Sequence, residues 1–155
     1  MDSISREIEV GIAVDKAFSI FVEDINNWWP QEYTWSQEKL NEIKIEGWEN
    51  GLCTEMGPFN FRCDWGRVTE FVENKRLRIK WQISPNREPV PDPESASDLH
   101  LEFVASHDSD SLIKFEHSNF ENHKNGAKKY REMMDSENGW DYILKRYKKY
   151  CEKKP

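Results

Sequence analysis

Four polar side chains on predicted strands have the chemistry to move a proton or to hold the polar end of a ligand. They are Arg6, Arg67, His100 and His117. Histidine changes charge near neutral pH and serves as an acid or a base, whereas arginine stays charged and binds oxyanions. Strand register decides which of the four face inward, and spacing alone leaves the register open. We expect these groups to orient a ligand rather than to catalyse a reaction.

Sequence signatures of common catalytic and metal sites are missing. The chain has no GxSxG, no P-loop and no GxGxxG after a strand, and its four histidines form no HExxH. The three cysteines, Cys53, Cys63 and Cys151, lack CxxC spacing. We therefore expect no catalytic residue, no metal and no cofactor, and three buried thiols. A disulfide between Cys53 and Cys63 across adjacent strands is the less favoured alternative.

Large aromatic side chains are frequent, at 13% of 155 residues, and seven of them are tryptophan. We expect most to fill the core and some to line a cavity. The pair Trp28–Trp29 before Pro30 is either a plug in the core or one wall of a pocket. The candidate cavity-lining residues are Trp28, Trp29, Phe61, Trp65, Trp81, Phe103, Phe115, His117, Trp140, Leu144 and Tyr147.

The C-terminal stretch predicts the helix that must cover this cavity. Apolar residues recur there in steps of three and four, which predicts a short helix near 126–134 and a long one near 137–152. A single helix that runs on continuously through both is the alternative. Ser136 is the expected N-cap of the long helix. Its apolar stripe contains Trp140, Ile143, Leu144, Tyr147 and Cys151.

The rest of the chain reads as a strand, a helix and about six further strands. Residues 4–12 alternate, with Arg6 as the polar exception, and a helix follows that Asp15 can cap and that residues 26–30 end. Gly66 permits a bulge, and residues 85–97 form either a mobile connection or a lid. The expected inward faces carry Leu52, Thr54 and Met56; Phe59, Phe61, Cys63 and Trp65; and Leu77, Ile79, Trp81 and Ile83.

This order predicts an α+β fold in one domain, residues 1–155. Antiparallel strands that alternate in polarity have one dry face, and the C-terminal helix is the element long enough to cover it. A curved sheet wrapped around that helix leaves an elongated space suited to an apolar ligand.

Charge and hydropathy restrict the partners. The net charge of −7 argues against a nucleic-acid surface. No apolar run approaches membrane-spanning length, and the N-terminus lacks the apolar stretch of a signal peptide. We expect a soluble, cytoplasmic protein.

Four segments carry a family resemblance: the GWENGL turn, the CDWGRVTEF strand, LRIKWQIS and the closing HSNF…GW…IL…Y pattern. With these segments the sequence resembles the START-like helix-grip superfamily, also called SRPBCC. Within it, the sequence is similar to the branch of activators of heat-shock-protein-90 ATPase homologues. The resemblance implies a helix-grip fold: a curved antiparallel sheet around a long C-terminal helix.

The resemblance and the missing motifs together indicate a non-catalytic domain that holds a hydrophobic or aromatic small molecule between sheet and helix. The alternative is a chaperone-associated accessory domain, since some relatives are cochaperones. A cyclase-type enzyme is the third candidate, because other distant relatives are cyclases.

Overall fold

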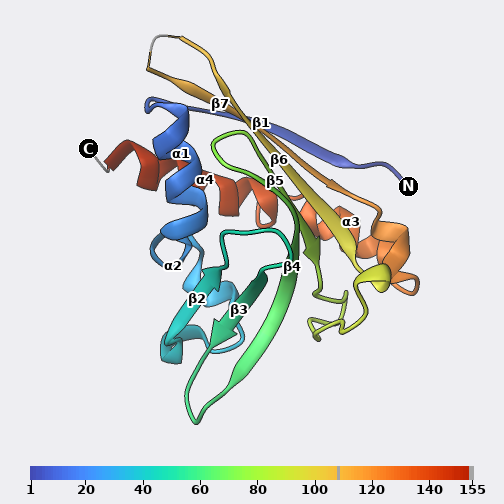
Figure 1. Ribbon diagram of the computed structural model, residues 1–155. Coiled ribbons are helices and arrows are strands. Elements are labelled where there is room, and N and C mark those ends of the chain that lie inside the picture. Colours follow the sequence, from blue (N-terminus) through green and yellow to red (C-terminus); the bar gives the residue numbers. More distant parts are fainter. Residues whose placement is uncertain (108, 154–155) are drawn as a thin grey trace.

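The computed structural model describes residues 1–107 and 109–153, and in this part of the chain seven antiparallel strands form one sheet in the order β1-β7-β6-β5-β4-β3-β2. The sheet curves around the C-terminal helix α4, which crosses its concave face (Figure 1). The predicted helix-grip architecture is confirmed. The strands are β1 (Ile4–Val10), β2 (Glu42–Ile45), β3 (Leu52–Met56), β4 (Arg62–Val72), β5 (Arg76–Trp81), β6 (Ser97–Ala105) and β7 (Ser111–Ser118).

The helices cover one face and one end of the sheet (Figure 1). Among the described residues, none of them is long and apolar enough to cross a membrane. The α-helices are α1 (Val14–Glu23), α2 (Ile25–Trp28), α3 (Ala127–Met134) and α4 (Trp140–Lys153), and the 3-10 helices are η1 (Gln31–Tyr33), η2 (Gln37–Lys39), η3 (Pro93–Ser95) and η4 (Phe120–His123).

The predicted apolar stripe of the last helix is buried in full. Each of its five residues, Trp140, Ile143, Leu144, Tyr147 and Cys151, is at most 4% exposed. The Tyr147 hydroxyl donates a 2.6 Å hydrogen bond to the carbonyl oxygen of Ala17, which ties α4 to α1. This stripe is where α4 packs against the sheet and α1.

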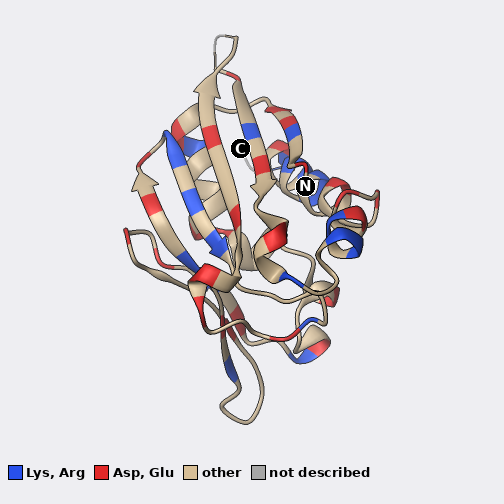
Figure 2. Cartoon of the chain, turned by 90° about the vertical axis from the view of Figure 1, so that its right-hand side faces the viewer, with Lys and Arg blue, Asp and Glu red and all other residues tan. Residues whose placement is uncertain are grey.

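Alternation along β5 separates a wet face of the sheet from a dry one. Leu77, Ile79 and Trp81 are buried, while the cationic residues between them face outward. On the outer face Lys80 pairs with Asp98 of β6 at 2.9 Å. Figure 2 shows acidic and basic positions interspersed over the strands and helices.

The bulge expected at Gly66 is present. Cys53 of β3 pairs with Gly66 and Thr54 with Asp64, so Trp65 is an extra residue in β4. A Cβ at Gly66 would lie 2.7 Å from the carbonyl oxygen of Lys80, so the close approach of β4 and β5 requires glycine here. The bulge lets both Trp65 and Gly66 face the interior.

Both predicted helix caps are wrong. Helix α1 begins at Val14 after Ala13, and Asp15 accepts only the N–H of Lys16. Helix α4 begins at Trp140, and the Ser136 hydroxyl donates to the carbonyl oxygen of Met133 in the turn that separates α3 from α4. Gly139 completes that turn, where a Cβ would collide with the carbonyl oxygen of Met134.

Two strand predictions also fail at their ends. Phe59 and Asn60 have positive φ in the turn between β3 and β4, so β4 begins only at Arg62 and Phe59 is 97% exposed. Strand β5 ends at Trp81, and Ile83 instead forms an isolated bridge with Pro89.

The phase predicted for β3 is reversed. Cys53 and Glu55 face the buried side, while Met56 is 37% exposed. Thr54 is buried on the opposite side, where it donates to Asp64.

The expectation of buried, free thiols is confirmed for all three cysteines, which lie in the described ranges. Burial raises the pKa of Cys151 to about 11. Cys63 pairs across the strands with Glu55 rather than with Cys53, so the alternative disulfide is absent from the described chain.

Candidate functional site

A pocket of about 840 Å³ opens at the end of α4 where the chain turns from α3. One side is the sheet, from β2 to β5. The other is the α3–α4 turn and the segment 31–39, which contains η1 and η2 and is here called the strap. The lining residues are Trp29, Glu32, Tyr33, Thr34, Trp35, Gln37, Ile43, Glu55, Trp65, Trp81, Ile83, Arg87, Lys129, Glu132, Met133, Met134, Ser136, Asn138, Gly139 and Ile143.

Three buried tryptophans form an aromatic wall, defined as Trp29, Trp65 and Trp81. The rings of Trp29 and Trp65 are stacked, with centroids 5.9 Å apart and planes inclined by 24°. Trp81 packs edge-on against Trp65 at 5.9 Å and tilted against Trp29 at 6.1 Å. None of the three is more than 9% exposed. The wall is therefore a contiguous layer of aromatic rings contributed by β4, β5 and the end of α2.

Hydrogen bonding differs among these indoles. Trp81 Nε1–H donates to the Tyr130 hydroxyl at 2.7 Å, and that hydroxyl donates to the carbonyl oxygen of Ile83. Burial raises the pKa of Tyr130 to about 12, so the hydroxyl stays protonated. Trp65 Nε1–H is buried without an acceptor among the described residues. Such a group is uncommon, because an unpaired buried donor loses its hydration without compensation.

Glu55 brings a carboxylate to the sheet side of the pocket. It is 1% exposed, with Ile43 and Cys63 beside it on the neighbouring strands. Its two oxygens accept the backbone N–H groups of Trp35 at 3.1 Å and Ser36 at 2.8 Å. In the described chain no lysine, arginine or histidine lies within ion-pair distance of it. Glu55 thus fastens the strap to the sheet.

Exposed and half-buried side chains form the rim. Trp35 Nε1–H donates to the carbonyl oxygen of Arg87 at 2.8 Å, which joins the strap to the connection after β5. Tyr33 donates to the carbonyl oxygen of Asn138, which joins the strap to the α3–α4 turn. Tyr142 donates to the carboxylate of Glu32 and thereby lowers the pKa of that acid. The connection 85–97, expected to be a mobile connection or a lid, contributes to the pocket rim through Arg87.

The structure divides the predicted cavity residues into three groups. Trp29, Trp65 and Trp81 line the pocket. Phe61 is 40% exposed in the β3–β4 turn and lies outside it. The others, which pack in the core away from the pocket surface, are Trp28, Phe103, Phe115, His117, Trp140, Leu144 and Tyr147.

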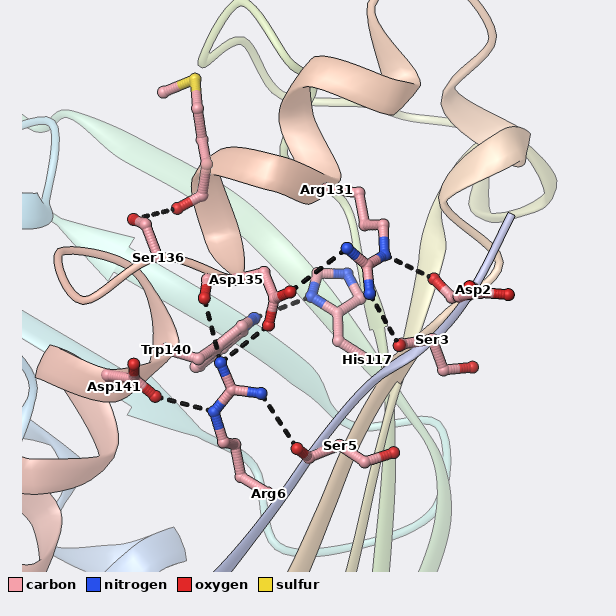
Figure 3. Close-up of polar contacts among 11 residues, drawn as sticks. Asp2, Ser3, Ser5, Arg6, His117, Arg131, Asp135, Ser136, Trp140 and Asp141 are labelled. Carbon is pink, nitrogen blue, oxygen red and sulfur yellow. Dashed lines mark hydrogen bonds and ion pairs between the residues drawn. The ribbon is translucent and has the colours of Figure 1, made fainter.

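None of the four polar candidates lines this pocket. Arg6 contacts Asp135 and Asp141, each at 2.7 Å, and so fastens β1 to the α3–α4 turn and to the first turn of α4 (Figure 3). Arg67 donates to the carbonyl oxygen of Asn50. His100 pairs with Arg78 and Glu116, which places it on the outer face of the sheet.

His117 belongs instead to a buried chain of hydrogen bonds. Trp140 Nε1–H donates to its Nδ1 at 2.9 Å, and the two side chains face each other in Figure 3. Ser97 Oγ lies 2.7 Å from His117 Nε2 and 2.8 Å from His123 Nε2. Burial lowers the pKa of both histidines, that of His117 well below its usual value. Both rings are therefore neutral at pH 7.

Sequence reasoning missed Glu55 and the strap, and it left open whether α3 and α4 are separate helices or one. The signal for Glu55 was Cys53, two residues earlier. Cysteine is usually buried, and residues two apart in a strand lie on the same face of the sheet. The strap has no regular apolar period, so its position against Glu55 had no sequence signal.

Solved structures share this fold over nearly the whole chain. An anthrahydroquino-gamma-pyrone synthase is 22% identical, with a TM-score of 0.68 and coverage of 96% of both chains. CalC, a self-sacrificing resistance protein from Micromonospora echinospora, is 20% identical, with a TM-score of 0.67 over 96% of this chain and 93% of that one. The Aha1 dimer from Colwellia psychrerythraea is 16% identical, with a TM-score of 0.65 over 99% and 98%. Likeness at these identities shows the fold alone.

Comparison at the level of sequence identifies one family. No curated protein matches the chain. The model of one family, described as Activator of Hsp90 ATPase homolog 1-like protein, matches residues 18–152.

Proposed function

Because the chain belongs to the family of Activator of Hsp90 ATPase homolog 1-like proteins, which adopts a fold built around a sheet–helix interior, we propose that it binds a small apolar or aromatic molecule. The site is the pocket between the sheet, the strap and the α3–α4 turn. The observation that carries the proposal is the aromatic wall of Trp29, Trp65 and Trp81 inside a pocket of about 840 Å³.

Size and lining both support this function. Ligand pockets commonly measure about 300–1,000 Å³ and combine an apolar wall with a few polar groups. A ligand that buries about 200 Å² of its own apolar surface in the pocket gains about 5 kcal/mol from that burial. The polar groups of the buried lining include the unpaired indole N–H of Trp65 and the carboxylate of Glu55.

Titration with Nile red, a neutral planar dye that fluoresces in apolar surroundings, tests the proposal. Ile83 is a half-buried pocket residue at the edge of the core, so Ile83→Trp narrows the pocket. We expect wild type to bind the dye and Ile83→Trp to weaken binding about tenfold. Val90→Trp is the matched control, since Val90 is half-buried in the same connection and outside the pocket. Equal binding by all three proteins would place the dye elsewhere and contradict the proposal.

A second candidate is an accessory role beside a chaperone ATPase, which the description of the family suggests. The observation that favours it is the 97% exposed ring of Phe59 at the β3–β4 turn, an apolar contact point away from the pocket. In this case added protein raises the ATPase rate of an Hsp90-type chaperone, and Phe59→Ser reduces the effect. A rate unchanged by the wild-type protein would rule the role out.

A further inference from the structure

Glu55 is a buried carboxylate without a cationic partner in the described chain. A charge taken out of water is costly unless an opposite charge or enough hydrogen bonds compensate it. Two backbone N–H groups from the strap supply part of this compensation, at 2.8 and 3.1 Å. A carboxylate has about four acceptor positions, so about two remain open.

The aromatic wall in the same pocket favours positive charge as well. The face of an indole ring is electrostatically negative, and tryptophan attracts organic cations more strongly than the other aromatic side chains do. Trp29, Trp65 and Trp81 offer three such rings, and the half-buried Trp35 of the strap lines the same space. Both the aromatic wall and the Glu55 side chain therefore favour a positively charged ligand over a neutral one.

The remaining charges of the pocket lie at its exposed rim. Glu32 and Glu132 are acidic, and Arg87 and Lys129 are basic, so the rim is balanced in sign. Exposed charges act through water and are weakened by salt, whereas the 1% exposed Glu55 is screened far less. Among the described lining residues, Glu55 is consequently the one buried acidic side chain, and no basic side chain of the lining is buried.

We infer that this pocket takes an organic cation: a ligand whose apolar or aromatic body packs on the aromatic wall and whose ammonium group pairs with Glu55. The inference rests on the proposed function, because it names the chemical class of ligand for the same pocket. An ammonium N–H donates to the open acceptor positions of the carboxylate, while its carbon framework displaces water from the indole faces.

A matched pair of probes tests the cation preference on the full chain. 2-Naphthylmethylammonium and 2-naphthylmethanol have the same aromatic body and differ in the charge of the end group. By isothermal titration calorimetry, the cation is expected to bind at least about tenfold more tightly than the alcohol, which is typical of a charge-assisted hydrogen bond in a dry site. Glu55→Gln is expected to reduce the ratio of the two affinities to about one, because it removes the charge that only the cation recognises. Glu132→Gln, which removes an exposed rim charge, is expected to retain the ratio.

A wild-type measurement keeps the inference testable if Glu55→Gln does not fold. The backbone N–H groups of Trp35 and Ser36 report on the carboxylate that accepts them. In amide NMR spectra both signals should shift with the cation and much less with the alcohol.

The outcomes separate the inference from the proposed function. Equal affinity for both probes, or a cation preference that survives in Glu55→Gln, overturns the cation inference and leaves an apolar pocket. Failure of both probes to bind argues against the pocket as a ligand site altogether.

Discussion

The indole N–H of Trp140 donates to Nδ1 of His117 at 2.9 Å, and this contact sets the direction of a buried hydrogen-bond chain. An indole N–H only donates, so Nδ1 accepts and the neutral ring carries its proton on Nε2. His117 Nε2–H then donates to Ser97 Oγ, and the Ser97 hydroxyl donates to His123 Nε2. His123 Nδ1 therefore carries a proton, and it is buried without an acceptor in the described chain. The chain joins the start of α4 to β7, β6 and η4.

Truncation of Trp140 is expected to destabilise the protein strongly. The side chain is 1% exposed, and Trp140→Ala leaves a cavity and an unpaired His117 Nδ1, so it costs about 3–5 kcal/mol. Lys148→Ala on the outer side of α4 should cost less than about 0.5 kcal/mol, since it loses only a 4.0 Å contact with Glu152. Urea unfolding compares the two, and equal midpoints would show that α4 is not docked through Trp140.

Acidification should destabilise the fold through His117 and His123, the two histidines of the buried hydrogen-bond chain. Burial lowers the pKa of both in the folded state, so below about pH 6.5 protons bind preferentially to the unfolded protein. The free energy of unfolding is therefore highest above that pH and falls as the pH drops, by up to about 1.4 kcal/mol per pH unit for each histidine. Urea melts between pH 7 and pH 5 measure this slope.

His123→Gln separates the contributions of the two rings. It removes one titrating group and retains a side chain able to accept the Ser97 hydroxyl. We expect a shallower slope than in wild type, with the part due to His117 remaining. If the free energy of unfolding of the wild-type protein did not change between pH 7 and pH 5, that result would contradict the conclusion that His117 and His123 are neutral in the folded protein.

Loss of Arg6 should loosen the α3–α4 turn, which forms one side of the pocket. Arg6 is partly exposed, at 27% of its side chain, and its hydrogen bond to Asp141 is the main reason that its pKa is raised. Arg6→Gln is expected to cost about 1 kcal/mol, and less at high salt, because partly exposed ion pairs are screened. Arg62→Gln, in the more exposed pair with Asp64, is the control, with an expected cost below about 0.5 kcal/mol. Equal losses in both variants would show that the Arg6 contacts add nothing specific.

The sequence predicted those helices and strands in which buried residues recur at regular spacing. The period of α4 and the alternation of β5 each identify a buried face, and both faces are buried as expected. Phe61 was misplaced because Phe59 and Asn60 adopt positive φ and end the extended conformation before it. Glu55 was missed because strand β3 buries Cys53 and Glu55, while the more apolar Met56 faces solvent. Hydrogen bonds to the strap stabilise the buried position of Glu55. Such a contact between distant parts of the chain leaves no periodic pattern in the sequence.

The central claim is that the aromatic wall binds a small molecule, and ¹⁹F NMR of protein labelled with 5-fluorotryptophan tests it most directly. The seven tryptophans give separate resonances, which single Trp→Phe variants assign. During titration with 2-naphthylmethanol, the signals of Trp29, Trp65 and Trp81 should move along one saturation curve. Trp48, which is 59% exposed and outside the pocket, should stay in place. A shift of Trp48 with the wall signals unmoved would contradict the account.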